Sequence, residues 1–221
     1  MPLDPIIDQP LDRPIPTDRS RTTLARVMGV MDANNYGNVH GGVIMRAVDE
    51  AGAVAAIRHS QGPCVTAFMD QMALLEPVKL GDLLTTRAQV NWTGRTSMEV
   101  GVRVTVQRQG QEDEIHVSTA YLVFVAIDPD GKPRPVPPIA PDTDEEILRF
   151  RAAEIRRASR LERRRAIKEL RERGIEPYRA PRMKPAPHAP CIVAKTAGSL
   201  RATEGGTPRA ARTLARRFAA A

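Results

Sequence analysis

The stretch MDANNYGNVHGGVIMRAVDEAGAVAAIRHS, residues 31–60, joins a polar loop that contains glycines to a long apolar segment. Between Val43 and His59 there is no proline, Gly52 is the only glycine, and apolar residues fall on nearly every side of a helical wheel. A helix that is apolar all round is usually a buried one. The pattern therefore predicts a central helix, about 25 Å long at 1.5 Å per residue, around which the rest of the chain folds.

Two acidic residues, Asp49 and Glu50, lie in the middle of this predicted helix, and Arg46 lies one turn before them. Burying a carboxylate costs free energy unless the group is paired or used chemically. Asp49 is therefore the first candidate for a functional residue.

The segments around the helix read as extended strands. Residues 98, 100, 102, 104 and 106 are apolar and alternate with more polar positions, a period of two that is typical of a strand. Similar runs occupy residues 22–30, 64–75, 83–93, 97–108 and 115–127. Short turns join the last four runs, which predicts antiparallel neighbours. We expect an α+β fold in which a curved antiparallel sheet wraps one helix and leaves one flank of it for a second copy.

The length and composition predict one folded domain with irregular ends. Residues 1–19 are rich in proline and acid and read as an irregular arm, and residues 20–140 hold the predicted domain. Residues 141–174 contain a charged helix, with Thr143 and Glu146 spaced as a capping box. Residues 175–221 are rich in Pro, Ala, Arg and Gly, and we expect a basic disordered tail there.

The formal net charge of +7 is carried by the C-terminal part of the chain. Residues 1–139 hold 13 Lys and Arg against 16 Asp and Glu, whereas residues 140–221 hold 20 against 10. The high isoelectric point therefore says little about the partners of the domain. Cys64 and Cys191 are too few for a disulfide framework. With no apolar run as long as a membrane span and no signal peptide, we expect a cytoplasmic protein.

Three motifs carry a resemblance to a known family. GNVHGG at residues 37–42, RAVDEAG at residues 46–52 and TGRTSMEVGV at residues 93–102 follow one another in the order found in hotdog-fold acyl-CoA thioesterases, particularly the cytosolic long-chain type. The resemblance covers roughly residues 22–160 and includes PVPPIAPDTDEE before the charged helix. It implies a hotdog fold and an acyl-CoA hydrolase that needs no metal or other cofactor, since CoA is part of the substrate.

The same resemblance implies site residues. The family's catalytic Asn lies in a DAN segment ahead of GNVHGG, which matches Asn34, and its catalytic Asp lies on the central helix, which matches Asp49. In tandem members the two come from different repeats. Here a symmetric dimer would build two equivalent sites, each from Asn34 of one subunit and Asp49 of the other. Many such thioesterases form hexamers of three dimers, although no residue in this chain demands it.

Thioester hydrolysis agrees with these residue types. It requires an oxyanion stabiliser, a positioned water and a base or nucleophile. Gly41 and Gly42 enter the helix N-terminus, where backbone N–H groups favour negative charge. Asp49 can act as base or nucleophile, and Asn34 can position the water or polarise the thioester. For the phosphates of CoA the candidates are a turn and strand start, Arg95, Thr96 and Ser97.

Each candidate also has a structural explanation. Asn34 suits a turn, because Asn tolerates left-handed backbone, and Asp49 can pair with Arg46 one turn away. Gly41 and Gly42 can serve close packing alone. His40 is an obvious general base, but the resemblance favours a role in bracing the loop.

Three functions follow, in order of preference. The first is hydrolysis of acyl-CoA, most simply fatty acyl-CoA, to the free acid and CoA. The second is another hotdog activity, either hydrolysis of acyl carrier protein thioesters or hydration of an enoyl thioester, since fold does not fix chemistry. The third is binding of nucleic acid or an anionic surface by the basic tail, which the 4% aromatic content and the lack of a binding motif make the least favoured.

Overall fold

The computed structural model describes residues 12–174. Most of the predicted arm and all of the predicted tail lie outside these residues. The chain divides into two compact units, Met1–Glu162 and Arg163–Ala221, and the fold and site described below belong to the first. No helix within residues 12–174 is long and apolar enough to cross a membrane.

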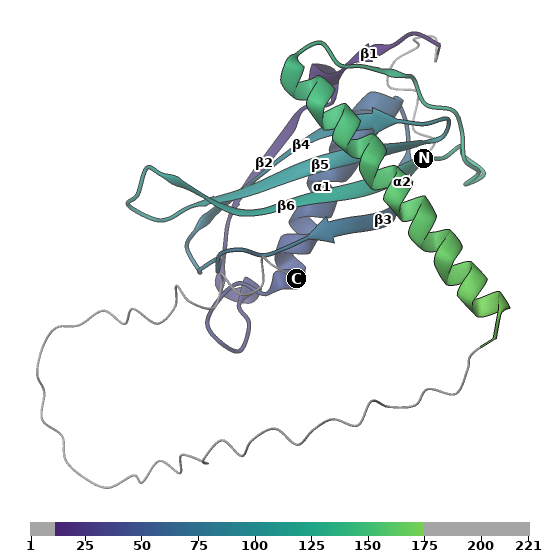
Figure 1. Cartoon of the computed structure of the whole chain (residues 1–221). Helices are drawn as coiled ribbons and strands as arrows, with labels where there is room; N and C mark the ends of the chain where they lie inside the picture. Colours follow the sequence, from purple (N-terminus) through teal and green to yellow (C-terminus); the bar gives the residue numbers. More distant parts are fainter. Residues whose placement is uncertain (1–11, 175–221) are drawn as a thin grey trace, which may run out of the picture. The chain divides into compact units, whose positions relative to one another are not determined.

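Five long strands and one central helix make the body of the first unit (Figure 1). The helix is α1 (Gly41–Ser60), and the strands are β2 (Thr22–Val27), β3 (Cys64–Met72), β4 (Leu83–Thr93), β5 (Ser97–Gln107) and β6 (Glu114–Ala126). The sheet order is β2-β4-β5-β6-β3, antiparallel throughout. The expected α+β hotdog fold is confirmed, with strand bounds close to the predicted ones.

One predicted neighbour pair is wrong. β3 and β4 follow one another in the chain, yet β3 pairs with β6 at one edge, and β4 pairs with β2 and β5 near the other edge. The physical reason is that α1 crosses the sheet between β2 and β3 and carries the chain from one edge to the other. The ten residues 73–82 then return the chain, a connection too long for a tight hairpin.

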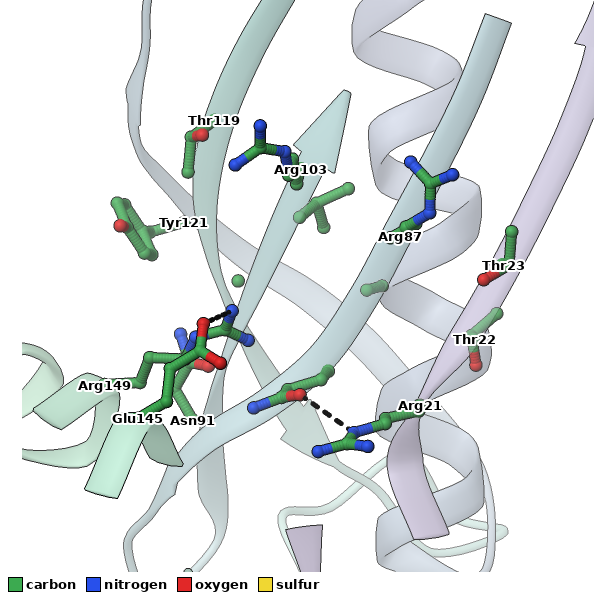
Figure 2. Close-up of a pocket in the computed structure, with 14 residues that line it drawn as sticks. Arg21, Thr22, Thr23, Arg87, Asn91, Arg103, Thr119, Tyr121, Glu145 and Arg149 are labelled. Carbon is green, nitrogen blue, oxygen red and sulfur yellow. Dashed lines mark hydrogen bonds and ion pairs between the residues drawn. The ribbon is translucent and has the colours of Figure 1, made fainter. Parts of the chain in front are cut away.

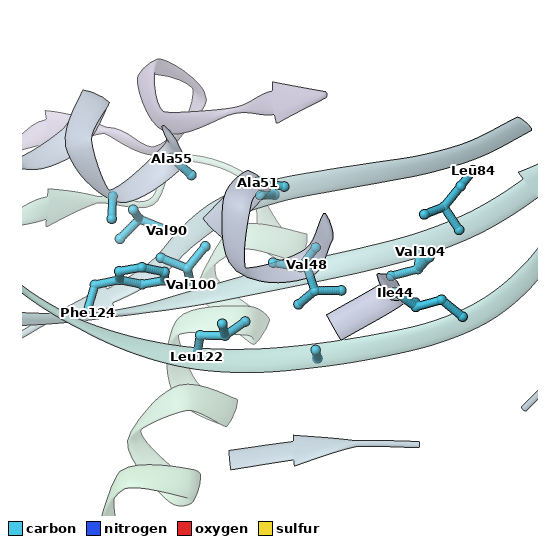
Figure 3. Packing of buried hydrophobic residues seen from close by; sticks show 14 of the residues in the cluster. Ile44, Val48, Ala51, Ala55, Leu84, Val90, Val100, Val104, Leu122 and Phe124 are labelled. Carbon is cyan, nitrogen blue, oxygen red and sulfur yellow. The ribbon is translucent and has the colours of Figure 1, made fainter. Parts of the chain in front are cut away.

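The core lies between α1 and one face of the sheet (Figure 3). Ile44, Val48, Ala51 and Ala55 face the sheet from α1, and the valines of β5 meet them because side chains alternate along a strand. The opposite flank of α1 carries the exposed residues Met45, Arg46 and Glu50. The sheet therefore covers only one side of the helix, as the sequence predicts.

Short elements close the ends of the sheet. Two-residue strands β1 (Ile15–Pro16) and β7 (Ile139–Ala140) pair in parallel, so the described end of the N-terminal arm is tied to the segment before the last helix. Two 3-10 turns, η1 (Thr17–Ser20) and η2 (Val30–Asp32), flank β2.

The charged helix is α2 (Asp144–Glu172). Its capping box is present, because Glu146 N–H donates to Thr143 Oγ1 at 3.3 Å and Thr143 N–H donates to Glu146 Oε2 at 3.3 Å. Residues of its first half reach the sheet face opposite α1. There Arg156 pairs with Glu99 at 2.6 Å and lies 3.6 Å from the ring centroid of Tyr121.

Candidate active site

Asp49 is held by a residue that sequence reasoning missed. The Thr66 hydroxyl on β3 donates to Asp49 Oδ1 at 2.6 Å. Asp49 is half-buried, on the flank of α1 that faces the edge strand β3. No motif or spacing in the sequence links residues 49 and 66. Threonine is common in strands, so its presence in this apolar strand does not indicate a contact with Asp49. Only the packing of β3 beside α1 brings the two together.

The sequence suggests Arg46 as an ion-pair partner of Asp49, and this suggestion is wrong. Arg46 donates to Glu50 Oε1 at 2.8 Å, four residues along the helix, and not to Asp49. Within residues 12–174, the second oxygen of Asp49, Oδ2, accepts no hydrogen bond. One carboxylate oxygen is thus oriented by Thr66 and the other is left for a ligand.

Asn34 shapes the loop before α1. Its Oδ1 accepts from the N–H groups of Tyr36 at 2.8 Å and Asn38 at 3.2 Å, and its own N–H donates to Asn38 O at 2.7 Å. These bonds establish the turn role that the sequence suggests. They use the carbonyl end of the side chain, and within the described residues 12–174 the NH2 group of this half-buried amide has no partner, so it can donate to a ligand.

Asp32, which is buried, fixes the ends of this loop. Asp32 accepts from Arg26 and from Gly29 N–H at 2.8 Å, and its own carbonyl accepts from His40 N–H at 2.8 Å. The Arg26 guanidinium and then the Gly29 N–H lower the pKa of Asp32, whereas burial opposes the shift. Asp32 is therefore ionised at neutral pH and holds the loop in place.

His40 caps α1, which is the bracing role expected for it. Its Nδ1 accepts from Gly42 N–H at 2.9 Å, and its carbonyl accepts from Val43 N–H at 2.9 Å. Of the two glycines proposed to stabilise an oxyanion, Gly42 thus already has a partner for its N–H. A Cβ on Gly41 would lie 3.2 Å from Leu74 Cδ1, and one on Gly42 would lie 3.1 Å from His40 Nδ1. Both positions therefore also require little bulk.

The predicted CoA contacts lie elsewhere in the chain. Arg95 and Thr96 form the turn from β4 into β5, and Ser97 begins β5. This turn lies at the end of the sheet where β3 starts after the C-terminus of α1, since Ser97 pairs with Val125 beside the Cys64–Ala126 pair. The Asn34 loop lies at the other end, where Asn38 bridges Lys79. One chain alone therefore does not bring the two sets together.

The described part of the chain offers no group of three or more His, Cys, Asp and Glu side chains that is able to hold a metal ion. His59 is buried, with Nε2 3.0 Å from Pro137 O. Burial lowers the pKa of His59, and the hydrogen bond to Pro137 offsets part of that shift. His59 is therefore a neutral residue with a structural role.

The comparisons with known proteins agree with this geometry. The family model of the thioesterase superfamily matches residues 36–112. The uncharacterized acyl-CoA thioester hydrolase YkhA of Bacillus subtilis is 36% identical over 129 residues, 58% of this chain and 74% of the relative. The cytosolic acyl coenzyme A thioester hydrolase of Rattus norvegicus is 30% identical over 154 residues, 68% of this chain but only 40% of the longer rat protein.

Solved structures extend the likeness to the fold. An acyl-CoA hydrolase of Staphylococcus aureus, solved with butyryl coenzyme A and coenzyme A, is 32% identical with a TM-score of 0.66, covering 72% of this chain and 97% of its own. A hexameric acyl-CoA thioesterase is 35% identical with a TM-score of 0.66, covering 68% and 97%. The fold and the loop-helix site define a thioester-processing enzyme of the hotdog class. The chain belongs to the thioesterase superfamily and, within it, to the acyl-CoA thioester hydrolases.

Proposed function

We propose that this enzyme hydrolyses fatty acyl-CoA to the free fatty acid and CoA at a site built from Asp49, Thr66 and Asn34. The observation that carries the proposal is the 2.6 Å hydrogen bond from Thr66 to Asp49. Alanine variants of the Staphylococcus aureus hydrolase have been solved for an Asn, an Asp 15 positions after it and a Thr 17 positions after that Asp. Asn34, Asp49 and Thr66 have the same identities and the same spacings.

The chemistry assigns a role to each group. Asp49 acts on the thioester carbonyl, either by taking a proton from water that attacks the carbonyl carbon or by attacking it directly as a nucleophile. The bond from carbonyl carbon to sulfur then breaks, and the CoA thiolate takes up the proton that came from water. After direct attack, water hydrolyses the anhydride between the acyl group and Asp49, which releases the acid and restores the carboxylate. The Thr66 hydroxyl orients the carboxylate, and the Asn34 NH2 group positions the water or polarises the carbonyl. Gly41 N–H at the start of α1 lies where developing negative charge is favoured.

We infer that each site is completed by a second subunit. The edge strand β3 exposes the apolar side chains of Val65 and Phe68, which pair with Val125 and Val123 on the sheet face opposite α1. The outer flank of α1 exposes Met45, one turn before Asp49. An exposed apolar edge strand is a template for pairing with another chain. A homodimer that covers this flank would bring Asn34 of one subunit to Asp49 of the other. Hexamers are known for similar thioesterases, and three such dimers would form one here.

The proposal includes a CoA-binding role for Arg95, Thr96 and Ser97. Because this turn lies away from Asn34 in one chain, the role requires that the dimer bring the turn of one subunit to the site of the other. Arg95→Ala is then expected to raise KM for acyl-CoA with kcat little changed.

The test is release of free thiol from acyl-CoA substrates of increasing chain length, comparing the full chain with Asp49→Ala and Asn34→Ala. We expect activity in the full chain and its loss in both variants, with the chain-length profile defining the substrate. Full activity of Asp49→Ala, or no thiol release from any acyl-CoA, would overturn the proposal. Acyl carrier protein thioesters in the same assay test the second candidate function.

We also propose that catalysis needs no metal and that the enzyme works in the cytoplasm. Dialysis against a chelator is expected to leave thiol release unchanged, and restoration of lost activity by an added divalent ion would contradict this. The scarcity of cysteine suits a reducing compartment, and the rat relative is named as cytosolic. Cell fractionation with an antibody to the full chain tests the location.

A further inference from the structure

A hollow of about 530 Å³ lies on the sheet face opposite α1 (Figure 2). Along β5, Val102 and Val104 are buried in the core. Because successive side chains alternate between the two faces, Arg103 between them points to this other face. Strands β2, β4, β5 and β6 and the start of α2 contribute to the wall. The hollow shares no lining residue with the proposed active site, and its volume lies within the range of small-molecule sites.

Four guanidinium groups line this hollow, from Arg21, Arg87, Arg103 and Arg149. The only carboxylate among its lining residues is Glu145, which pairs with Arg149 at 2.5 Å. Figure 2 shows these side chains arranged around the opening.

Arg87 and Arg103 stand directly opposite each other on neighbouring strands. Like charges in this arrangement repel and destabilise the sheet. Glu114 binds Arg87 at 2.9 Å and 2.5 Å, but within residues 12–174 no carboxylate lies within ion-pair distance of Arg103. Glu146 pairs with Arg21 at 2.8 Å, and Glu145 pairs with Arg149. Among residues 12–174, Arg103 is therefore the lining guanidinium without an ion pair, and its positive charge is what an anionic ligand would relieve.

Two buried amides face the same hollow with unused hydrogen-bonding atoms. Gln89 is 6% exposed and Asn91 is 5% exposed, and both line the wall. Gln89 Oε1 accepts from Arg21 at 3.4 Å, but among the described residues Gln89 Nε2 and Asn91 Oδ1 have no partner. Buried polar groups are almost always satisfied, so unpaired ones require an explanation.

The backbone makes room for Asn91. The register of β4 against β5 shifts between Val90 and Trp92, which leaves Asn91 at a bulge, and bulges often re-aim a side chain beside a functional site. A Cβ on Gly101 would lie 2.5 Å from Asn91 Nδ2. The glycine therefore allows the amide to lie over the strand.

We propose that this hollow binds a phosphorylated small molecule of about mononucleotide size, with Arg103 and Arg87 holding the phosphate. Guanidinium groups match phosphate oxygens with paired hydrogen bonds. Gln89 Nε2 offers a donor and Asn91 Oδ1 an acceptor to the uncharged polar part of the ligand. This site is separate from acyl-CoA hydrolysis and does not depend on the proposed function.

The test is titration of the full chain with inorganic phosphate, adenosine, AMP and CoA at constant ionic strength. Trp92 is the only tryptophan of the chain and follows Asn91, so its fluorescence reports binding, and calorimetry gives the affinity. We expect saturable binding of AMP, weaker binding of phosphate and none of adenosine. Arg103→Gln should weaken AMP binding by about tenfold or more, and Arg103→Lys by less.

Arg151→Gln is the matched control, because Arg151 is an exposed α2 residue that pairs with Glu154 at 3.0 Å and does not line the hollow. It should bind AMP as the unchanged chain does. If Arg103→Gln does not fold, as judged by circular dichroism, Asn91→Ser replaces it.

Three results would overturn the proposal. One is the absence of saturable binding of every phosphorylated probe at millimolar concentration. Another is AMP or CoA binding that Arg103→Gln leaves unchanged, which would place those ligands at another site. The third is loss of the oligomer in Arg103→Gln together with no AMP binding by the unchanged chain, which would assign the arginines to a contact between subunits.

Discussion

Among residues 12–174, the Thr66 hydroxyl has one hydrogen-bond partner, Asp49 Oδ1, and this bond orients the Asp49 carboxylate. A half-buried Asp on a helix can rotate about its side-chain bonds, whereas one held by a 2.6 Å hydrogen bond presents its other oxygen in a fixed direction. Preorganisation of this kind lowers the barrier only if the carboxylate takes part in the reaction. Thr66 is thus a positioning residue.

Thr66→Val keeps the shape of the side chain and removes its donor. Loss of a hydrogen bond to a charged group is worth about 1.5–3 kcal/mol, or roughly 10- to 100-fold in rate. We expect kcat for acyl-CoA to fall by that factor with KM little changed, and Thr66→Ser to restore most of it. Steady-state thiol release measures both constants. An equal loss in the Ser and Val variants would show that packing, and not the hydroxyl, is what matters.

Because of the buried His59, the stability of the fold is expected to depend on pH. It is 0% exposed, and burial lowers the pKa of this imidazole in the folded state. The unfolded chain therefore binds the proton more readily, so the contribution of His59 to stability is complete above about pH 6.5 and is lost as pH falls through the folded pKa.

Urea unfolding from pH 7.5 to 5 is expected to show a falling free energy of unfolding. His59→Gln can still donate to Pro137 O but does not titrate, so its decline over this range should be shallower. Parallel curves for the two proteins would remove His59 as the cause. Lowered pKa values of Asp32, Glu114 and Glu146 predict a further decline below about pH 4.5, as these carboxylates become protonated.

At the scale of elements, buried charge fixes α2 to the sheet at Arg156 and Arg160. Glu99 on β5 has a fully buried side chain and accepts from Arg156 at 2.6 Å and Arg160 at 3.2 Å. Arg160 also pairs with Asp70 on β3 at 2.7 Å. These ion pairs explain why a helix with few apolar residues stays on the sheet. The same low apolar content explains why the sequence alone predicts a surface helix.

Glu99→Gln is expected to destabilise the fold by about 3 kcal/mol, because it leaves the largely buried Arg156 guanidinium without its carboxylate, whereas Arg160 keeps Asp70. The control is Glu154→Gln on the exposed side of α2, where the ion pair with Arg151 should be worth under about 1 kcal/mol. Urea midpoints at pH 7 compare the two. Similar small losses in both variants would mean that water compensates the buried arginines.

At the scale of the whole molecule, we expect the two subunits of a dimer to share their active sites. If each site combines Asn34 of one subunit with Asp49 of the other, a mixed dimer of the two alanine variants contains one intact site. Random exchange makes half of the dimers mixed, so a 1:1 mixture should recover about a quarter of the unchanged activity.

The measurement is thiol release after unfolding and refolding the two variants together, beside each variant refolded alone. Recovery only in the mixture supports a shared site. Absence of recovery, with mixed dimers detected by differently tagged subunits, would place both residues in one subunit.

Local patterns in the sequence determined much of this protein. The apolar run at residues 43–59, the alternation along β5 and the capping box of α2 each depend on residues close together in the chain, so they could be predicted from it. The motif around residues 37–42 likewise led to the family, and with it to Asn34 and Asp49. These features follow from short-range physics or from a continuous stretch of sequence.

Tertiary structure alone decided the rest. The pairing of β3 with β6 depends on the path of α1 across the sheet, and the Thr66–Asp49 bond depends on that pairing. The Arg87–Arg103 hollow likewise needs side chains from strands brought together in one register. None of these contacts has a periodic signature, because each joins residues whose separation along the chain bears no fixed relation to their distance in space.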